Sequence, residues 1–306
     1  MIPQQDFPIA ERVLMQGLEE FAEIVKVNEP LAPYTYLRIG GPADALVQPR
    51  SAQELSAVVR KCSEAKVSLR VLGGGGNILV RDAGVRGVVL RLSEPAFTQV
   101  AVQGKRVRAG TGATLSAFIS ETARNGLAGL ETLVGIPGTV GGALRCNAGD
   151  RSGEIGQYVR SVDVLDENGQ LQTRDRDELR FADRWSNLDD PVLLAAEFEL
   201  DSDHVDAIVK RLRKAWIQRK ANQPLSYQAA GRIFKNPRGH SAAALITQAG
   251  LAGTKVGGAE ISERDANFIV TAPAASARDV LGLIELIRSK VQERSAIQLE
   301  LEIAVW

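Results

Sequence analysis

The chain has 306 residues, and its 37 lysines and arginines balance 37 aspartates and glutamates, so the formal net charge is zero. That length can form two or three domains, and the balanced charge argues against binding of nucleic acid or of an anionic membrane through an overall positive field. Two cysteines and two histidines are too few for a disulfide framework or a histidine-rich metal site, so we expect no metal.

The first twenty residues mix acidic with apolar side chains and contain no continuous hydrophobic run. A secretion signal or a membrane-spanning helix needs such a run. We therefore expect a cytoplasmic protein with no membrane partner.

The next part of the chain predicts a mixed α+β unit. Apolar runs at 45–48, 69–72 and 87–92 indicate short strands, and 98–102 with 105–109 indicates a hairpin that turns at Gln103 and Gly104. Two helices are also expected. One follows the capping pattern Ser51 to Glu54 and turns Leu55, Val58, Val59 and Cys62 to one face, and the other follows Thr114 with Leu115, Phe118 and Ile119 inward.

The sheet is predicted to continue through a second hairpin, 162–165 with 171–173, and a strand at 192–200. Residues 201–224 then follow a helical period. Its apolar stripe is Val205, Ile208, Val209, Leu212 and Trp216. The basic run Lys210, Arg211, Arg213 and Lys214 lies outside this stripe and indicates a solvated face, with a nucleic-acid contact as the alternative.

A new unit is expected from Pro224 onward. It comprises a helix at 242–249, a strand at 267–271 and a long helix that a capping box from Ser276 to Asp279 opens. Residues 297–305 alternate between apolar and other side chains, so we expect a strand with Glu300 and Glu302 on its polar face.

Glycine clusters are the most informative feature of the chain. Four glycines follow an apolar run at 73–76, and a longer glycine-rich stretch extends from Gly129 to Gly149 with a single proline and almost no charge. Such bare backbone suits close approach by a large, phosphate-bearing cofactor, since backbone amides can bind phosphate oxygens. Neither cluster matches the dinucleotide fingerprint or the phosphate loop of nucleotide-binding folds. Tight turns between strands are the alternative interpretation.

Six segments taken together resemble the UDP-N-acetylenolpyruvoylglucosamine reductase family, in the family's order and over roughly residues 30–305. They are 36–43, 73–77, 110–113, 135–142, 234–237 and 267–270. The spacing after Asn147 is more similar to the compact, type II members. The resemblance implies a two-lobed FAD-binding unit of the vanillyl-alcohol-oxidase type, residues 1–95 and 96–223, plus a smaller C-terminal α+β substrate domain, residues 224–306.

The family reduces the enolpyruvyl group of a UDP-sugar with NADPH and noncovalent FAD, which makes UDP-N-acetylmuramate for peptidoglycan. The resemblance places the cofactor on Arg38, Gly73, Gly74, Gly75, Gly76, Asn77, Gly110, Thr111, Gly112, Ala113, Gly135, Ile136, Pro137, Gly138, Thr139, Gly141 and Gly142. It places the substrate on Lys220, Lys235, Asn236 and Asn267, with Gly257 and Gly258 nearby.

Hydride addition to the enolpyruvyl double bond puts negative charge on the neighbouring carboxylate, so the site needs a cation and an acid there. By resemblance these are Arg184 and Glu302. A surface arginine and a solvated glutamate at a strand edge are the alternatives.

The chain departs from the family's pattern at the proton donor. A serine or cysteine is expected after Gly231, and Arg232 stands there instead; a guanidinium is a poor general acid near neutral pH. His240, Ser241, Tyr227 and Cys146 are the other candidates. Further departures are Asp150, Arg151, Asp183, Arg264 and Asp265. One interpretation keeps the reductase, with Arg232 as a charge stabiliser and another group or water as the proton donor. A second is a flavin fold with changed or lost activity, an oxidase or a binding protein, and a third is a non-enzymatic nucleic-acid or scaffold protein. The sequence leaves open the oligomeric state and the preference for NADPH over NADH.

Overall fold

The computed structural model describes residues 19–150, 152–224 and 232–306. The predictions for most of the first twenty residues, for Arg151 and for Tyr227 lie outside these ranges. Within them, no helix is both long enough and apolar enough to cross a membrane.

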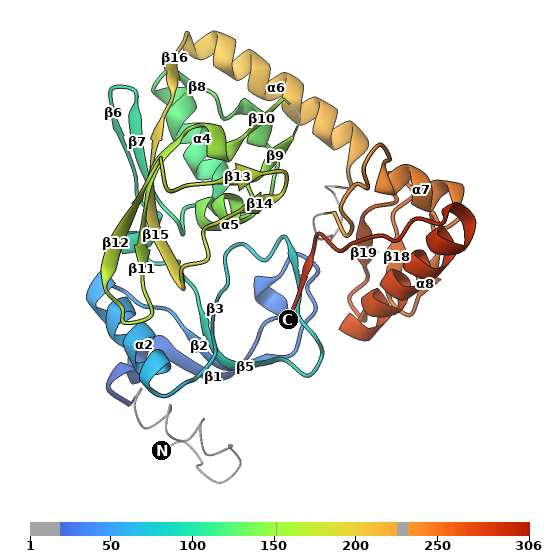
Figure 1. Ribbon diagram of the computed structural model, residues 1–306, viewed down its shortest axis with the longest axis horizontal. Helices are drawn as coiled ribbons and strands as arrows, with labels where there is room; N and C mark the ends of the chain where they lie inside the picture. The colour runs from blue at the N-terminus through green and yellow to red at the C-terminus, as the bar shows by residue number, and fades with distance from the viewer. Residues whose placement is uncertain (1–18, 151, 225–231) are drawn as a thin grey trace. The chain divides into compact units, whose positions relative to one another are not determined.

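The chain divides into two compact units (Figure 1). The first unit takes in residues up to Glu29, Ala43–Gly73 and Arg86–Trp216, and the second takes in Pro30–Pro42, Gly74–Val85 and Ile217–Trp306. Both units are therefore discontinuous in sequence. The boundaries predicted at 95/96 and 223/224 remain a prediction.

A four-stranded sheet with the order β1-β2-β5-β3 begins the first unit. Its strands are β1 (Val25–Pro30), β2 (Pro42–Val47), β3 (Leu69–Val71) and β5 (Val85–Leu90), and it is preceded by the 3-10 helix η1 (Glu19–Ile24). Helix α2 (Ala52–Glu64) starts after Ser51, whose side chain accepts a hydrogen bond from the amide of Glu54, and it buries the four residues expected on its inner face. The sequence prediction for this helix is confirmed.

A five-stranded sheet with the order β12-β11-β15-β7-β6 follows in the same unit. Its strands are β6 (Val100–Gln103), β7 (Arg106–Gly110), β11 (Val159–Leu165), β12 (Leu171–Asp175) and β15 (Val192–Glu199). Gln103 pairs with Arg106, so the first hairpin turns at Gly104 and Lys105, one residue later than predicted. The second hairpin forms as expected, with Leu165 opposite Leu171.

Helices α4 (Leu115–Arg124) and α5 (Val140–Arg145) pack with this sheet around Phe118 and Phe198. Smaller elements complete the unit: α3 (Pro95–Thr98), β8 (Leu127–Ala128), η3 (Glu131–Leu133), β9 (Gly149–Asp150), β10 (Gly153–Glu154), η4 (Ile155–Gln157), β13 (Phe181–Ala182), β14 (Trp185–Ser186) and β16 (Asp201–Ser202). One buried cluster gathers around α2 and a separate one around α4 and α5, so the unit has two hydrophobic cores. Two cores are what a two-lobed unit requires.

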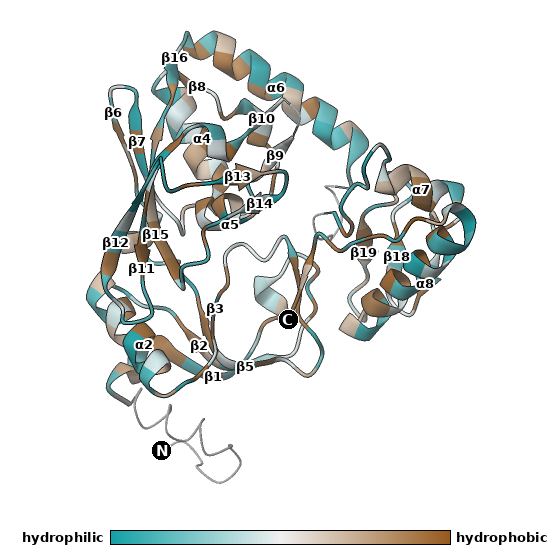
Figure 2. Ribbon diagram, in the orientation of Figure 1, coloured by the Kyte–Doolittle hydropathy of each residue, from teal (hydrophilic) through white to brown (hydrophobic). Residues whose placement is uncertain are grey.

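Helix α6 (Val205–Asn222) carries the chain from the first unit into the second. The helical prediction is confirmed from Val205 onward, but of the predicted apolar stripe only Ile208 is fully buried. Val205 and Trp216 are exposed, and Figure 2 shows apolar and polar residues along the visible side of the helix. Arg211 in the basic run is held by Glu131 and Asp203, at 2.8 and 2.7 Å.

The second unit centres on α8 (Ala277–Ser295), which packs on a three-stranded sheet with the order β17-β18-β19. The capping box of Ser276 and Asp279 is present, as predicted. Besides α8, the second unit contains η2 (Ala32–Tyr34), β4 (Ile78–Leu79), α7 (Ala242–Gln248), β17 (Lys255–Val256), β18 (Ala259–Ile261), β19 (Ile269–Thr271) and β20 (Ala304–Val305).

The strand predicted at 297–305 forms only in part. β20 pairs in parallel with β4, and Leu301 makes a single bridge to Phe234. Leu299 and Ile303 are nevertheless buried, and their apolar neighbours at alternate positions pack on the same core. The alternation therefore predicted burial correctly without a continuous strand.

Candidate functional site

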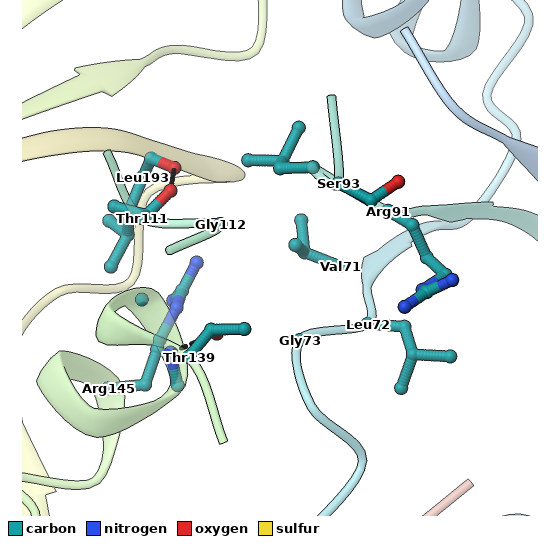
Figure 3. Close-up of a pocket in the computed structure, with 13 residues that line it drawn as sticks. Val71, Leu72, Gly73, Arg91, Ser93, Thr111, Gly112, Thr139, Arg145 and Leu193 are labelled. Carbon is teal, nitrogen blue, oxygen red and sulfur yellow. Dashed lines mark hydrogen bonds between the residues drawn. The ribbon is translucent and has the colours of Figure 1, made fainter. Parts of the chain in front are cut away.

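A cavity that is partly open to solvent lies in the first unit. Its walls come from the segments that follow β3, β5 and β7, from α5 and from β15. The lining residues are Val71, Leu72, Gly73, Arg91, Leu92, Ser93, Thr111, Gly112, Thr139, Gly141, Gly142, Arg145 and Leu193 (Figure 3). Six residues predicted to bind the cofactor are among them: Gly73, Thr111, Gly112, Thr139, Gly141 and Gly142.

Main-chain hydrogen bonds hold two of the predicted cofactor loops together at this cavity. The amides of Val140 and Gly141 donate to the carbonyls of Ala113 and Thr111, both at 2.9 Å. The Thr111 hydroxyl donates to the carbonyl of Leu193 at 2.5 Å (Figure 3). The amides of residues 110–113 all donate hydrogen bonds to carbonyls of the protein. This loop can therefore contact a ligand through its surface but not through its amides.

The glycines at the cavity divide into two kinds. A methyl group on Gly110 or Gly112 would collide with the carbonyl oxygen of Phe97 or Leu92, so these glycines serve the fold itself. A methyl group on Gly142 would lie 3.7 Å from the Thr139 hydroxyl, and one on Gly138 would meet nothing within 4 Å. Space beside Gly138 and Gly142 is therefore left open, as close approach of a cofactor to bare backbone requires.

The part of the first glycine cluster that belongs to the second unit, residues 74–77, differs in its main-chain hydrogen bonding. Within the described chain, the amides of Gly74, Gly75, Gly76 and Asn77 donate no hydrogen bond, although Gly75 and Gly76 are buried. Buried amides normally have acceptors, and consecutive amides without them suit an anion such as a diphosphate. Gly75 also has a φ of +68°, and a methyl group there would meet the carbonyl oxygen of Tyr34.

Arg145 at the cavity was not predicted from the sequence. Its guanidinium donates to the carbonyl oxygens of Leu188 and Asp190. Burial lowers the pKa of Arg145, and the charges of Asp189 and Asp190 partly oppose that effect. A charged residue directly after the small and largely apolar run 138–144 was the available signal. The guanidinium gives the cavity a positive charge.

Arg184 lies in the two-residue turn of a small hairpin in the first unit. The hairpin pairs Phe181 with Ser186 and Ala182 with Trp185. Arg184 is half-buried and has a φ of +55°, a left-handed conformation that costs a non-glycine residue roughly 1–2 kcal/mol. Strain of this kind concentrates at functional positions.

Glu302 and Arg232 come together in the second unit. The amide of Glu302 donates to the carbonyl of Ile233 at 2.9 Å, so Glu302 is paired with the residue that follows Arg232. Asn77 of the glycine cluster donates from Nδ2 to the carbonyl of Glu302 at 3.2 Å. Three residues predicted for catalysis or cofactor binding are thus gathered from opposite ends of the chain.

Asp265 adds a carboxylate beside Arg232. Burial raises the pKa of Asp265 above its ordinary 3.8, while a hydrogen bond from the Asn267 amide and the charge of Arg232 oppose the rise. Asp265 was noted in the sequence only as a departure from the family's pattern.

The four residues predicted to bind substrate fall into two groups. Lys220, Lys235 and Asn236 are exposed; Lys235 lies 3.4 Å from Glu300, and Asn236 accepts a hydrogen bond from Ala242 at 3.0 Å. Asn267 is buried, and its carboxamide bonds both the amide and the carbonyl of Phe234, at 2.9 and 2.8 Å. Asn267 therefore shapes the Arg232 segment. Arg38, predicted at the cofactor, is exposed, has a φ of +55° and donates to the carbonyl of Pro33 at 2.6 Å.

Three of the four alternative proton donors lie in the described residues. Ser241 caps α7, His240 is exposed, and Cys146 bonds the carbonyl of Gly142 at 3.1 Å. In the same ranges, no group of three or more histidine, cysteine, aspartate or glutamate side chains could hold a metal ion.

Two family models match the chain. The FAD binding domain matches residues 43–174, and the UDP-N-acetylenolpyruvoylglucosamine reductase C-terminal domain matches residues 223–306. The first of these ranges includes the cavity's glycines, and the second includes Arg232 and Glu302.

Relatives match over most of the chain. UDP-N-acetylenolpyruvoylglucosamine reductase 2 of Symbiobacterium thermophilum is 40% identical over 98% of this chain and 97% of its own length. The reductase of the same name from Moorella thermoacetica is 41% identical over 92% of this chain and 93% of its own length.

Solved structures agree with this result. The crystal structure of the reductase (MurB) from Thermus caldophilus is 38% identical, with a TM-score of 0.79 over 92% of this chain and 98% of that one. The glucose dehydrogenase Phl p 4.0202 shares the fold alone, at 14% identity and a TM-score of 0.50 over 65% of this chain and 45% of that one. The two-lobed FAD-binding fold class expected from the sequence is confirmed.

Proposed function

Because the chain belongs to the UDP-N-acetylenolpyruvoylglucosamine reductase family, we propose that it reduces UDP-N-acetylglucosamine-enolpyruvate to UDP-N-acetylmuramate with NADPH and FAD. The observation that carries this proposal is the 40% identity with a reductase over 98% of the chain. The alternative of a flavin-fold oxidase or binding protein is not favoured, since the relatives that match the whole chain are named reductases.

The wider setting follows from the reaction. UDP-N-acetylmuramate is a peptidoglycan precursor, so the proposed role includes cell-wall synthesis in the cytoplasm, and through it cell shape, cell division and the cell cycle. The proposed partner is a UDP-sugar. The ion pairs of Arg211 on the basic run of α6 give no reason to add nucleic acid.

The residues present fit FAD. In the first unit, open space beside Gly138 and Gly142 accepts a ligand against bare backbone. In the second unit, taken by itself, the consecutive amides of Gly74 to Asn77 suit a diphosphate. We assign cofactor contacts to the cavity residues Gly73, Thr111, Gly112, Thr139, Gly141 and Gly142, and we add Arg145. Bound FAD supplies hydride transfer from NADPH to the substrate double bond.

Residues of the chain itself are proposed to stabilise the charge that develops on the substrate and to supply an acid. Addition of hydride leaves negative charge on the substrate carboxylate, and the guanidinium of Arg184 is proposed to stabilise it. Glu302 is proposed to present its carboxylic acid to the same group. Lys220, Lys235 and Asn236 are proposed to contact the UDP-sugar, with Asn267 holding the Phe234 main chain behind them.

Arg232 is proposed as a second cation rather than as the acid. A guanidinium group in general is a poor general acid near neutral pH. The carbon next to the carboxylate must therefore receive its proton from another group or from water.

Two assays test the proposal. Acid precipitation of the purified protein should release FAD into the supernatant, because no covalent anchor is expected in the cofactor loops. NADPH oxidation should then depend on UDP-N-acetylglucosamine-enolpyruvate and yield UDP-N-acetylmuramate by mass spectrometry. Flavin that stays in the pellet contradicts the noncovalent cofactor, and NADPH oxidation without the reduced product contradicts the reductase.

A further inference from the structure

The hairpin that carries Arg184 is too small to hold its own orientation. It consists of β13 and β14, two residues each, with only two residue pairs between them. A two-stranded hairpin is marginal even at greater length. The position of the Arg184 turn must therefore depend on the groups that anchor the hairpin from outside.

Asn147 is such an anchor. It follows α5 and is fully buried. Its Nδ2 donates to the carbonyl of Ala182 at 2.9 Å and to Oε2 of Glu154 at 2.6 Å, and its Oδ1 accepts from the amide of Gly156 at 3.1 Å. The carboxamide thus joins the end of α5, the β10 segment and the first strand of the hairpin.

Two further contacts fix the same hairpin. The Ser186 hydroxyl, which is buried, donates to the carbonyl of Arg145 at 3.0 Å. Phe181 packs so closely on Gly156 that a methyl group there would collide with the ring and lie 2.8 Å from Oδ1 of Asn147. The hairpin is therefore anchored to the chain segment that runs from Arg145, at the cavity, to Gly156.

Backbone geometry allows the Asn147 contact to be tested cleanly. Asn147 has a φ of +41°, in the left-handed region that asparagine and glycine tolerate best. Replacement by glycine therefore keeps the backbone conformation and removes only the carboxamide, whereas alanine would add strain.

We propose that Asn147 is a positioning residue that holds the Arg184 turn in place through the Ala182 carbonyl. The proposal rests on the proposed role of Arg184 in stabilising charge on the substrate. Asn147 acts on the reaction only through Arg184, and it does so from the same segment that forms the cavity.

The first test compares Asn147→Gly with wild type. Flavin content and flavin reduction by NADPH should stay within about twofold, while flavin reoxidation by UDP-N-acetylglucosamine-enolpyruvate should slow at least about tenfold, because a small displacement of a charge-stabilising group is costly. Thr122→Val is the matched control: it removes another buried hydrogen bond, Oγ1 to the carbonyl of Ile119 at 3.0 Å, away from the hairpin. It should leave both half-reactions within about twofold.

A double mutant separates positioning from general damage. If Asn147 works through Arg184, Asn147→Gly should cause little further loss of reoxidation in an Arg184→Ala background. Full multiplication of the two losses, or an unchanged rate in Asn147→Gly alone, would overturn the proposal.

A readout without cofactor or substrate completes the test. In apoprotein, trypsin should cleave after Arg184 faster in Asn147→Gly than in wild type or Thr122→Val, because the turn opens more often. Equal cleavage rates would show that Asn147 does not hold the turn. If wild-type flavin is not reoxidised by the substrate, the proposed function fails, whereas the trypsin comparison still decides the anchoring.

Discussion

Nδ2 of Asn77 donates a hydrogen bond of 3.2 Å to the main-chain carbonyl of Glu302, although 225 residues separate the two in sequence. The amide of Ala304 also donates to the carbonyl of Asn77, at 3.0 Å. The glycine cluster proposed to bind diphosphate and the acid proposed for catalysis thus share one piece of backbone. A substitution that displaces the backbone of either segment is therefore expected to displace the other.

Gly142→Ala should weaken FAD binding without harming the fold. The new methyl group has room in the protein itself, and alanine in a helix stabilises it by up to about 1 kcal/mol relative to glycine. It would, however, occupy the space proposed for the cofactor, so we expect the dissociation constant for FAD to rise at least about tenfold, about 1.4 kcal/mol. Titration of apoprotein with FAD measures this.

Gly112→Ala is the matched control for Gly142→Ala. Its methyl group would collide with the Leu92 carbonyl, so the apoprotein should lose about 1–3 kcal/mol of stability. Thermal unfolding of both apoproteins should show a lower midpoint for Gly112→Ala only. Unchanged FAD affinity in Gly142→Ala would place the cofactor elsewhere.

Arg184→Ala and Glu302→Gln should slow flavin reoxidation by substrate about a hundredfold or more and leave flavin reduction by NADPH nearly intact. Both side chains are proposed to meet charge that develops only when the substrate is reduced, and loss of one such group typically has that effect. Stopped-flow measurements of the two half-reactions provide the comparison. Equal slowing of both would indicate cofactor displacement instead.

The activity of Arg232 variants should depend on whether the new side chain carries a positive charge or a proton that it can transfer. Arg232→Lys should retain part of the activity because it keeps the charge, and Arg232→Ser should retain or raise it because a hydroxyl can pass on a proton. Arg232→Ala offers neither and should be the slowest. Solvent deuterium incorporated next to the product carboxylate, followed by mass spectrometry, reports the protonation step. An alanine variant as fast as wild type would remove Arg232 from the reaction.

Asp265 should make stability depend on pH. Burial raises the pKa of Asp265, so the folded state holds this proton more tightly than the unfolded chain. Its favourable contribution is present below the ordinary value of 3.8 and is lost as pH rises through the raised value. Asp265→Asn should therefore be more stable than wild type at neutral pH, with the difference shrinking toward pH 3.

Arg232→Ser should raise the pKa of Asp265 further, because it removes the opposing charge. Free energies of unfolding measured across this pH range for wild type, Asp265→Asn and Arg232→Ser provide the check. A difference between wild type and Asp265→Asn that does not change with pH would show that Asp265 titrates as it does in the unfolded chain.

Local signals in the sequence predicted much of the fold. The capping residues Ser51, Thr114 and Ser276 each begin the helix expected of them, because the cap hydrogen bonds depend only on neighbouring residues. The C-terminal segment was harder, since a strand needs a partner and alternation does not reveal one. Ala304 and Val305 pair with β4, and Leu301 makes a single bridge to Phe234.

Several residues assigned to the candidate site from the sequence have contacts in the structure other than those expected. Gly75 was expected to make room for the diphosphate, yet the carbonyl of Tyr34 lies where its methyl group would be. Asn267 was expected at the substrate, and its carboxamide bonds the main chain of Phe234. Arg145, which lines the cavity, and Asn147, which we propose positions the Arg184 turn, were not singled out in the sequence because their contacts with residues 182–190 follow from no local pattern.

The reaction proposed for this chain is the reduction of an enolpyruvyl UDP-sugar. The most direct test reduces the protein-bound flavin with one equivalent of NADPH under anaerobic conditions and then mixes it with UDP-N-acetylglucosamine-enolpyruvate in a stopped-flow instrument. We expect rapid return of the oxidised flavin absorbance together with one equivalent of UDP-N-acetylmuramate. Flavin that stays reduced in the presence of this substrate would show that the chain does not carry out this reaction.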